Sequence, residues 1–326
     1  MVIDDVAGTD DGRAFQILGA AELTPEPTGP VACLPVLGRE GFIVRGWCHV
    51  LAAHPKSGKT ELMARLVRAW ESDRALYLSE EPVDAWRERM RRLGGSWDHV
   101  RVGFALGAGP AAVRSAIEGS DATVVVIDTI RTLLGLTDEN DNGAVAAALV
   151  PLIRAARARG VTLILVHHSR KAGGLWGVGV AGAHSLVALV DVVLELGRVP
   201  GVPRRRTISG LARVHTVPTL VYEQEDDLTF TPLGDPARLA TLALRERIKE
   251  ALDFDPISIK DLRDQMDPPR PGQTCLRASL NALVADGEVL RHPPHGGRGR
   301  RCEYYLPGGP TFEERMRMLA ETPILL

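Results

Sequence analysis

The sequence has few cysteines, and none of them lies close to another along the chain. Only 4 of the 326 residues are cysteines, and they form no CxxC pair. This spacing argues against a zinc module and against a disulfide framework, and it fits a protein of a reducing cytoplasm. We expect all four to be ordinary small buried or surface residues: Cys33, Cys48, Cys275 and Cys302.

The chain also lacks a large net charge and a secretory leader. A formal net charge of -2 at pH 7 excludes a uniformly basic nucleic-acid coat. Contacts with nucleic acid would have to come from local patches, such as the arginines in 204–206 and 298–301. Acidic residues occupy the start of the chain, where a signal peptide would have a basic start and an apolar core, so we expect no export.

One apolar run approaches the length of a membrane span but is interrupted. It extends from Val178 to Leu196 and contains His184 and Asp191. A central aspartate costs about 3 kcal/mol in a membrane helix. We therefore expect a buried segment of a soluble core and no membrane contact.

The pattern of apolar runs predicts an α/β fold with a mostly parallel central sheet. Residues 1–30 are rich in Pro, Gly and acidic residues without a period, which is typical of a flexible arm. Over 31–236, short apolar runs alternate with helical patterns, as in a parallel sheet covered on both faces. The expected parallel strands are 48–53, 75–79, 100–105, 123–128 and 162–168, and antiparallel edge strands are expected at 205–212, 219–224 and 228–232.

Two of the intervening helices carry clear apolar stripes at helical spacing, which we expect to pack on the sheet. The stripes consist of Leu62, Leu66 and Trp70 in one helix, and of Val83, Trp86, Met90 and Leu93 in the next.

The last third of the chain has a different pattern. Helical segments at 239–252, within 257–266, and from 273 to an end at 286–287 precede two strand-like arms, which are joined by a loop rich in Pro, Gly and Arg. Three helices followed by such a hairpin predict a winged helix-turn-helix domain over 237–308. We expect a helical tail over 309–326, with a helix from Phe312 to Ala320.

The stretch AAHPKSGKT has the parts of a phosphate-binding loop. It follows an apolar strand and opens an amphipathic helix, so backbone amides and the helix N-terminus can face phosphates. Lys59 suits the outer phosphates and the Thr60 hydroxyl suits magnesium. Ala53 stands where the loop normally opens on glycine, which an ordinary backbone conformation tolerates. The predicted nucleotide-binding residues of this loop are Pro55, Lys56, Ser57, Gly58, Lys59, Thr60 and Glu61.

Acidic residues end two of the predicted strands. Asp128 ends TVVVID, where its carboxylate would face the same edge as Lys59 and, with Thr60, hold magnesium. Glu80 and Glu81 follow ALYLS and are placed to orient and deprotonate water. The sequence therefore predicts ATP and Mg2+ as cofactors.

These residues resemble the RepA-like plasmid replicative helicases and their KaiC and DnaB relatives, of the RecA-like P-loop ATPases. The resemblance implies that Glu81 first, and Glu80 second, is the catalytic base. It also implies a phosphate sensor at His167 or His168, although from the residues alone two adjacent histidines could simply pack and hydrogen-bond. The segments that carry the resemblance are HPKSGKT, LYLSEEP, VVVIDT, DEND and LVHHSRK, within about Gly41 to Pro232.

The same resemblance implies an arginine finger supplied by a neighbouring subunit, and hence a ring or a filament. Of these we expect a homo-oligomeric ring hexamer. SGLARVHTVPT resembles the segment that bears the finger, which makes Arg213 the candidate, although Leu211 occupies the position of a companion lysine. The alternatives that stay open are Arg198, Arg205 and Arg206.

Two surfaces are candidates for DNA. The loop 170–177 has basic residues, glycines and Trp176, which suit a single strand in a ring channel. In the C-terminal module, Gln273, Arg277 and Asn281 share one helix face that suits duplex DNA. The arginines expected at the wing tip are Arg298, Arg300 and Arg301.

The leading hypothesis is a cytoplasmic, DNA-dependent motor ATPase of the hexameric replicative helicase type, from a plasmid, phage or integrated element. The alternative is an ATP-gated DNA-binding regulator or loader without helicase activity. A metabolic kinase is disfavoured, because no lid or substrate pocket is evident.

Overall fold

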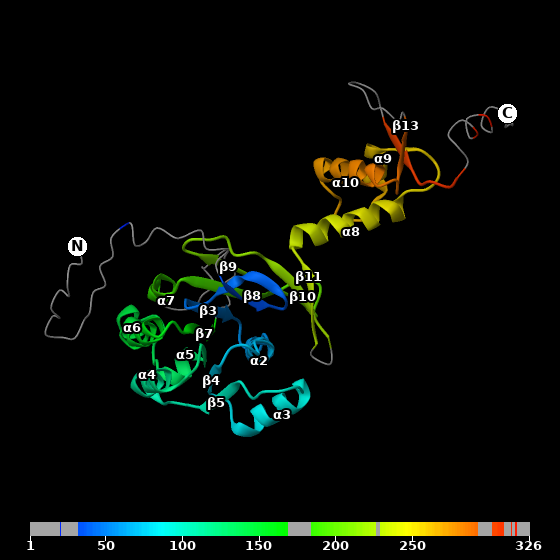
Figure 1. The fold of residues 1–326 in the computed structure, drawn as a ribbon. Helices are drawn as coiled ribbons and strands as arrows, with labels where there is room; N and C mark the ends of the chain where they lie inside the picture. Colours follow the sequence, from blue (N-terminus) through cyan, green and yellow to red (C-terminus); the bar gives the residue numbers. More distant parts are fainter. Residues whose placement is uncertain are drawn as a thin grey trace.

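The protein has an α/β core built on a nine-stranded, mostly parallel sheet, as expected from the sequence (Figure 1). The computed structural model describes residues 32–168, 184–225, 229–292 and 302–309, and the single positions 20, 314 and 317. The strand order is β11-β10-β9-β8-β3-β7-β6-β4-β5. The parallel strands are β3 (Cys48–Ala53), β4 (Ala75–Ser79), β5 (Val100–Phe104), β6 (Val124–Asp128), β7 (Thr162–His168) and β8 (Val192–Arg198); β9 (Arg205–Ala212), β10 (Leu220–Gln224) and β11 (Phe230–Gly234) are antiparallel.

The central strands β3, β6 and β7 are mostly apolar and buried because helices cover both faces of the sheet. In β6, Val125 and Ile127 pack in the hydrophobic cluster of α4, α5 and α6, whereas Val124 and Val126 pack in the cluster of α2 and α3. Complete burial of each such side chain contributes roughly 1.5–3 kcal/mol. The helices of the core are α2 (Lys59–Ala69), α3 (Val83–Leu93), α4 (Gly109–Gly119), α5 (Ile130–Leu134), α6 (Asn142–Ala158) and α7 (His184–Leu189).

The predicted apolar stripe of α2 is buried, but that of α3 is only partly so. Trp86 is buried and Met90 and Leu93 are half-buried, whereas Val83 is 40% exposed. Val83 lies in the first turn, directly after Pro82, where the chain leaves the sheet edge, so its expected packing is wrong. None of the described helices is long and apolar enough to cross a membrane.

A two-stranded hairpin, β1 (Cys33–Val36) and β2 (Arg39–Val44), precedes the first strand of the main sheet. This hairpin is not among the elements expected from the sequence. Leu34 and Phe42 are buried with the side chains of α2, and the indole Nε1 of Trp70 donates a 2.8 Å hydrogen bond to the carbonyl oxygen of Pro35. The hairpin therefore extends the core on the α2 side.

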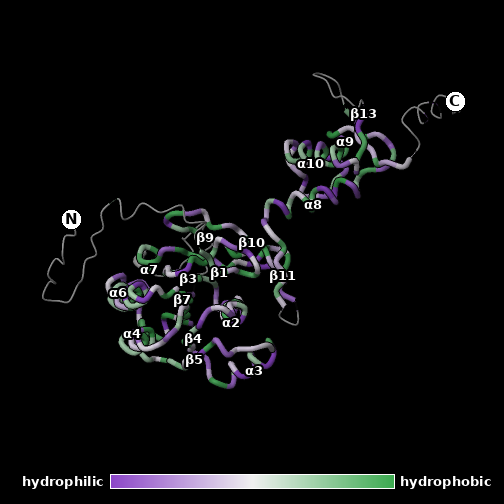
Figure 2. The backbone as a smooth tube through the Cα atoms, in the orientation of Figure 1, coloured by the Kyte–Doolittle hydropathy of each residue, from purple (hydrophilic) through white to green (hydrophobic). Residues whose placement is uncertain are grey.

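The C-terminal elements have a hydrophobic core of their own, which includes Ile248, Leu262, Leu276 and Tyr304. A three-stranded sheet of order β12-β14-β13 packs with three helices, and Figure 1 shows this unit standing off from the main sheet beyond β11. Figure 2 shows alternating hydrophobic and hydrophilic positions along α8. The elements are α8 (Pro236–Ala251), β12 (Ile257–Ser258), α9 (Ile259–Gln265), α10 (Gln273–Ala285), β13 (Leu290–His292) and β14 (Glu303–Tyr305).

Four predicted features lie outside the described residues. They are the N-terminal arm 1–30 apart from position 20, the loop 170–177, the arginines 298–301 of the expected wing and, apart from positions 314 and 317, the helix from Phe312 to Ala320.

Candidate functional site

A cavity of about 470 Å³ lies at the edge of the sheet where the parallel strands end. It brings together the glutamates after β4, the aspartate that ends β6 and the turn after β3, as the common polarity of these strands requires. Its lining residues are Pro55, Lys56, Ser57, Gly58, Lys59, Thr60, Glu61, Glu80, Glu81, Arg89, Asp128, Thr129 and His168.

The turn before α2 fixes the lysine. Gly58 precedes the helix with φ of 93°, a left-handed conformation that favours glycine. Lys59 is buried, and its Nζ donates hydrogen bonds to the carbonyl oxygens of Ala53 (3.1 Å) and His54 (3.0 Å). Burial lowers the pKa of Lys59 to about 8. The ammonium group therefore sits in a water-poor site where a phosphate would stabilise its charge.

His168, and not His167, faces the cavity. Nδ1 of His168 lies 3.0 Å from Nζ of Lys59, and burial together with that lysine lowers the pKa of His168. The neutral imidazole can then accept a hydrogen bond from Lys59. His167 is 1% exposed, and its Nδ1 lies 3.6 Å from Oε1 of Glu139, away from the cavity lining.

Asp128 is held by two hydroxyl groups. The hydroxyl of Tyr77 donates a 2.5 Å hydrogen bond to Oδ2 of Asp128, and the hydroxyl of Thr60 is also hydrogen-bonded to this carboxylate. Burial raises the pKa of Asp128, and both hydrogen bonds oppose that rise. A carboxylate beside a threonine hydroxyl is a pair of hard oxygen ligands suited to Mg2+.

No cluster of three or more His, Cys, Asp or Glu side chains in the described part of the chain is arranged to hold a metal ion. Magnesium commonly binds through one or two carboxylates together with phosphate oxygens and water. Thr60 and Asp128 fit a site of this kind, in which the phosphate oxygens of a nucleotide and water supply most of the Mg2+ ligands.

The two glutamates have different surroundings. The backbone N–H of Glu80 donates to the carbonyl oxygen of Asp128 (2.9 Å), and its Oε2 accepts a 2.9 Å hydrogen bond from the hydroxyl of Thr129. The Glu81 carboxylate instead accepts two hydrogen bonds from Arg89, at 2.6 and 3.2 Å. The Glu80 carboxylate thus accepts a hydrogen bond from a neutral hydroxyl, whereas the Glu81 carboxylate accepts two from a charged guanidinium group.

Arg89 lines the cavity although it was not expected there from the sequence. Its side chain is only 11% exposed, and the guanidinium group lies 5.0 Å from the ring centroid of Trp86 and 3.4 Å from Glu61. The sequence does offer one indication that Arg89 is partly buried, since it directly precedes Met90 of the apolar stripe of α3. Its distance of eight residues from Glu81 conceals the contact, which forms because α3 folds back over the end of β4.

Arg213 lies at the opposite edge of the sheet. It follows Ala212, which pairs with Val192 at the start of β8, and its guanidinium group lies 3.8 Å from Asp191. It is not among the residues that line the cavity of its own chain. The alternative arginines lie near the other end of β8: Arg198 pairs with Arg206 in the sheet, and Arg205 lies 3.5 Å from Glu223.

In the C-terminal unit, Gln273, Arg277 and Asn281 are exposed on one face of α10. They line a shallow hollow of about 290 Å³ together with Thr274 and Ala278. The shared face predicted from their spacing is therefore present.

Comparisons with known proteins agree with a nucleotide-binding core. Residues 30–174 match the model of the AAA domain family AAA_25. The chain is 35% identical over 196 residues to the DNA repair protein RadA of Mycobacterium tuberculosis, from strains CDC 1551 / Oshkosh and ATCC 25618 / H37Rv. That match covers 58% of this chain and 39% of the relative, so the chain aligns with well under half of RadA.

Two solved structures are similar at low sequence identity. A KaiC-like protein from Pyrococcus horikoshii OT3 is 15% identical with a TM-score of 0.46, covering 62% of this chain and 99% of its own. The RadB recombinase is 17% identical with a TM-score of 0.46, covering 59% and 93%.

Proposed function

We propose that this chain is a DNA-dependent ATPase with a RecA-like core and a C-terminal winged-helix domain. The observation that carries the proposal is the single cavity that joins Lys59, Asp128 and Glu80. A buried lysine at a helix start, a buried strand-end carboxylate and a further carboxylate are the groups needed for a triphosphate, its metal and a nucleophilic water.

Nucleotide binding would depend on positive charge and hydrogen-bond donors that face the phosphates. The turn before α2 offers backbone amides and Lys59 to the phosphates of ATP. The hydroxyl of Thr60 and the carboxylate of Asp128 would hold Mg2+, which supplies positive charge against the outer phosphates. His168 accepts a hydrogen bond from Lys59, so binding of a phosphate by this lysine would weaken that contact. This exchange is how His168 would sense the phosphate.

For the catalytic base, the contacts favour Glu80 over Glu81, the reverse of the preference drawn from the sequence. Both carboxylate oxygens of Glu81 accept hydrogen bonds from Arg89, so they are less available to accept one from a water molecule. Glu80 has no such partner within the described residues, and the Thr129 hydroxyl orients it. We assign Arg89 the role of holding Glu81 in place.

The substrate class rests on the relatives and on the C-terminal unit. A relative named as a DNA repair protein favours DNA as the partner. The order of helices and strands from α8 to β14 supports a winged helix, whose α10 would present Gln273, Arg277 and Asn281 to duplex DNA. A ring hexamer with an arginine finger in trans, and helicase activity in the cytoplasm, complete this proposal.

The second candidate is an ATP-gated regulator or loader that binds DNA without separating strands. The separate hydrophobic core of the C-terminal unit favours it, since such a unit can recognise DNA by itself. Unwinding of a forked duplex, measured alongside ATP hydrolysis, discriminates the two. Hydrolysis stimulated by single strands with unwinding supports the helicase, and the same stimulation without unwinding supports the regulator.

A further inference from the structure

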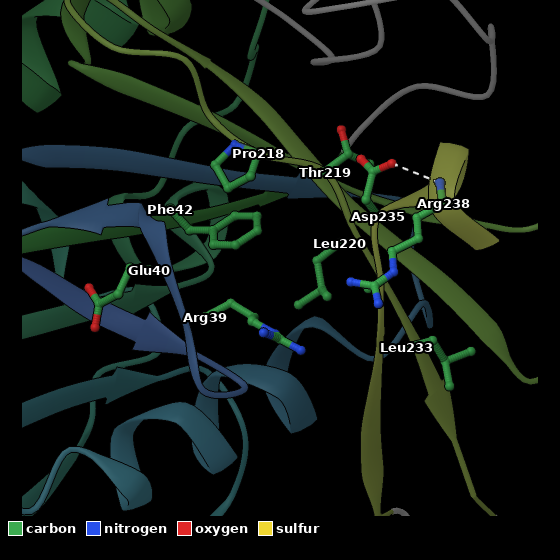
Figure 3. Close-up of a pocket in the computed structure, with 10 residues that line it drawn as sticks. Arg39, Glu40, Phe42, Pro218, Thr219, Leu220, Leu233, Asp235 and Arg238 are labelled. Carbon is green, nitrogen blue, oxygen red and sulfur yellow. Dashed lines mark hydrogen bonds between the residues drawn. The ribbon is translucent and has the colours of Figure 1, made fainter. Parts of the chain in front are cut away.

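A second cavity, of about 310 Å³, lies where the β1–β2 hairpin meets the start of α8 (Figure 3). Ligand pockets of this size are often found where separate structural units join. This cavity shares no residue with the phosphate cavity, so a ligand bound here would be separate from the nucleotide. Its lining residues are Arg39, Glu40, Phe42, Pro218, Thr219, Leu220, Leu233, Gly234, Asp235 and Arg238.

Two arginines face this cavity without an acidic partner. Figure 3 shows the guanidinium groups of Arg39, from the start of β2, and Arg238, from the first turn of α8, both directed into the space between these elements. Both residues are exposed, and neither side chain makes a hydrogen bond or an ion pair within the described residues. Both guanidinium groups are therefore available to a ligand.

The two acidic residues of the lining do not neutralise these arginines. The Glu40 carboxylate points away from both of them (Figure 3). One carboxylate oxygen of Asp235 accepts hydrogen bonds from the backbone amides of Ala237 (2.8 Å) and Arg238 (3.1 Å), and thereby caps α8. An acidic ligand could bind the two guanidinium groups through paired, charge-assisted hydrogen bonds.

The floor of the cavity is apolar and offers no open aromatic ring on which a base could stack. Phe42, the one aromatic residue of the lining, is 1% exposed, and Leu220 is buried beside it. Leu233 is half-buried and Pro218 is exposed at the rim. Sites for single-stranded nucleic acid commonly combine basic residues with exposed aromatic rings. The lining therefore suits the acidic and apolar side chains of a peptide better than a nucleotide.

We propose that this cavity is the docking site for an acidic peptide segment of a partner protein. Two carboxylates of the peptide bind Arg39 and Arg238, and an adjacent bulky apolar side chain covers Leu220 and Leu233. Charge complementarity at the rim and an apolar floor beneath it carry this assignment. Arginine contacts around a bulky side chain in a pocket are typical of the few residues that dominate interface affinity.

The position of the cavity gives such a partner a route to both parts of the chain. Arg39 belongs to the hairpin that extends the main core, whereas Arg238 belongs to α8, whose later residue Ile248 lies in the separate hydrophobic core of the C-terminal unit. A peptide that binds both arginines at once would connect the core with the start of this unit.

The test is fluorescence anisotropy of a labelled peptide, Asp-Asp-Leu-Phe, titrated with the full chain. We expect saturable binding with a Kd below about 1 mM. Affinity should fall at least about fivefold in Arg39→Ala/Arg238→Ala, because two charge-assisted contacts are lost. The peptide Asn-Asn-Leu-Phe should lose a similar factor and tests the same contacts in the unaltered protein. Arg101→Ala removes an exposed arginine outside the lining and should keep the affinity.

An arginine-modifying reagent, with mass spectrometry of the products, locates the bound peptide. Asp-Asp-Leu-Phe should protect Arg39 and Arg238 from the reagent and leave Arg101 reactive. Unchanged thermal unfolding of the double arginine variant would show that it is folded. Neither readout involves ATP, so both are independent of the proposed hydrolysis.

Three results would overturn the proposal: no saturable binding of Asp-Asp-Leu-Phe, an affinity that is insensitive to charge removal from the protein and from the peptide, or arginine reactivity that the peptide does not change. Protection of Arg39 and Arg238 by a single-stranded oligonucleotide but not by the peptide would instead assign the cavity to nucleic acid. Self-association that depends on these two arginines, without peptide binding, would assign it to a second copy of the chain.

Discussion

Nζ of Lys59 lies 3.0 Å from Nδ1 of His168, across the gap between the turn after β3 and the end of β7. The two strands are neighbours in the sheet, with Ala53 paired to His168. The contact therefore connects Lys59, which would bind a phosphate, with His168, the last residue of β7. Through this pair, the presence of a phosphate would change the hydrogen bonding of His168.

The low pKa of Lys59 predicts that nucleotide affinity decreases as the pH rises above about 8. Burial lowers this pKa to about 8, and a bound phosphate would raise it again. Above pH 8 binding must therefore take up a proton, and affinity should fall by up to about tenfold per pH unit. Calorimetric titration at pH 8.5 in buffers of different ionisation enthalpy measures the proton uptake, which should vanish at pH 6.5.

The same shift has a consequence for stability in the absence of nucleotide. Between pH 8 and the ordinary lysine pKa of 10.5, the unfolded chain binds a proton at this position and the folded chain does not. The contribution of Lys59 to the free energy of unfolding therefore rises with pH across that window. The pH dependence of unfolding in Lys59→Met, compared with wild type, checks the sign.

Glu80→Gln should abolish turnover while keeping nucleotide binding. Loss of a general base lowers the rate about 10²-fold or more. Glu81→Gln should have a smaller effect on the rate, since Glu81 is held by Arg89. Steady-state hydrolysis and nucleotide affinity of both variants are the measurements. Normal turnover in Glu80→Gln with none in Glu81→Gln would restore the sequence-based preference for Glu81.

Asp128→Asn should raise the Mg2+ concentration needed for half-maximal hydrolysis, by at least about tenfold, because a charged ligand is replaced by a neutral one. Asp121→Asn is the matched control, since Asp121 is 57% exposed and lies far from the cavity lining. A parallel shift in both variants would argue against a metal ligand at Asp128.

Arg277→Ala should weaken binding of duplex DNA by about 5- to 150-fold, the effect of losing one base or phosphate contact of about 1–3 kcal/mol. Arg114→Ala, an exposed arginine of α4, is the control. Fluorescence anisotropy at fixed ionic strength measures both, because the affinity varies with salt. Equal affinities would assign the face of α10 to another partner.

The sequence predicts the strands of the main sheet well, because a continuous apolar run such as TLILVHH is typical of a central strand that is covered on both faces. Their positions in the sheet are not readable from the sequence, since crossovers place β3 between β7 and β8. The β1–β2 hairpin was not predicted because its strands are short and follow closely on residues 1–30, whose sequence shows no hydrophobic periodicity. Arg89 escaped because its role depends on how α3 folds back over β4.

Hydrolysis of ATP by the wild type and by Lys59→Ala, with and without single-stranded DNA, tests the central claim most directly. The account predicts turnover that single strands stimulate in the wild type, and at least about 100-fold weaker nucleotide binding with no turnover in the variant. Turnover that is unchanged by Lys59→Ala would contradict it.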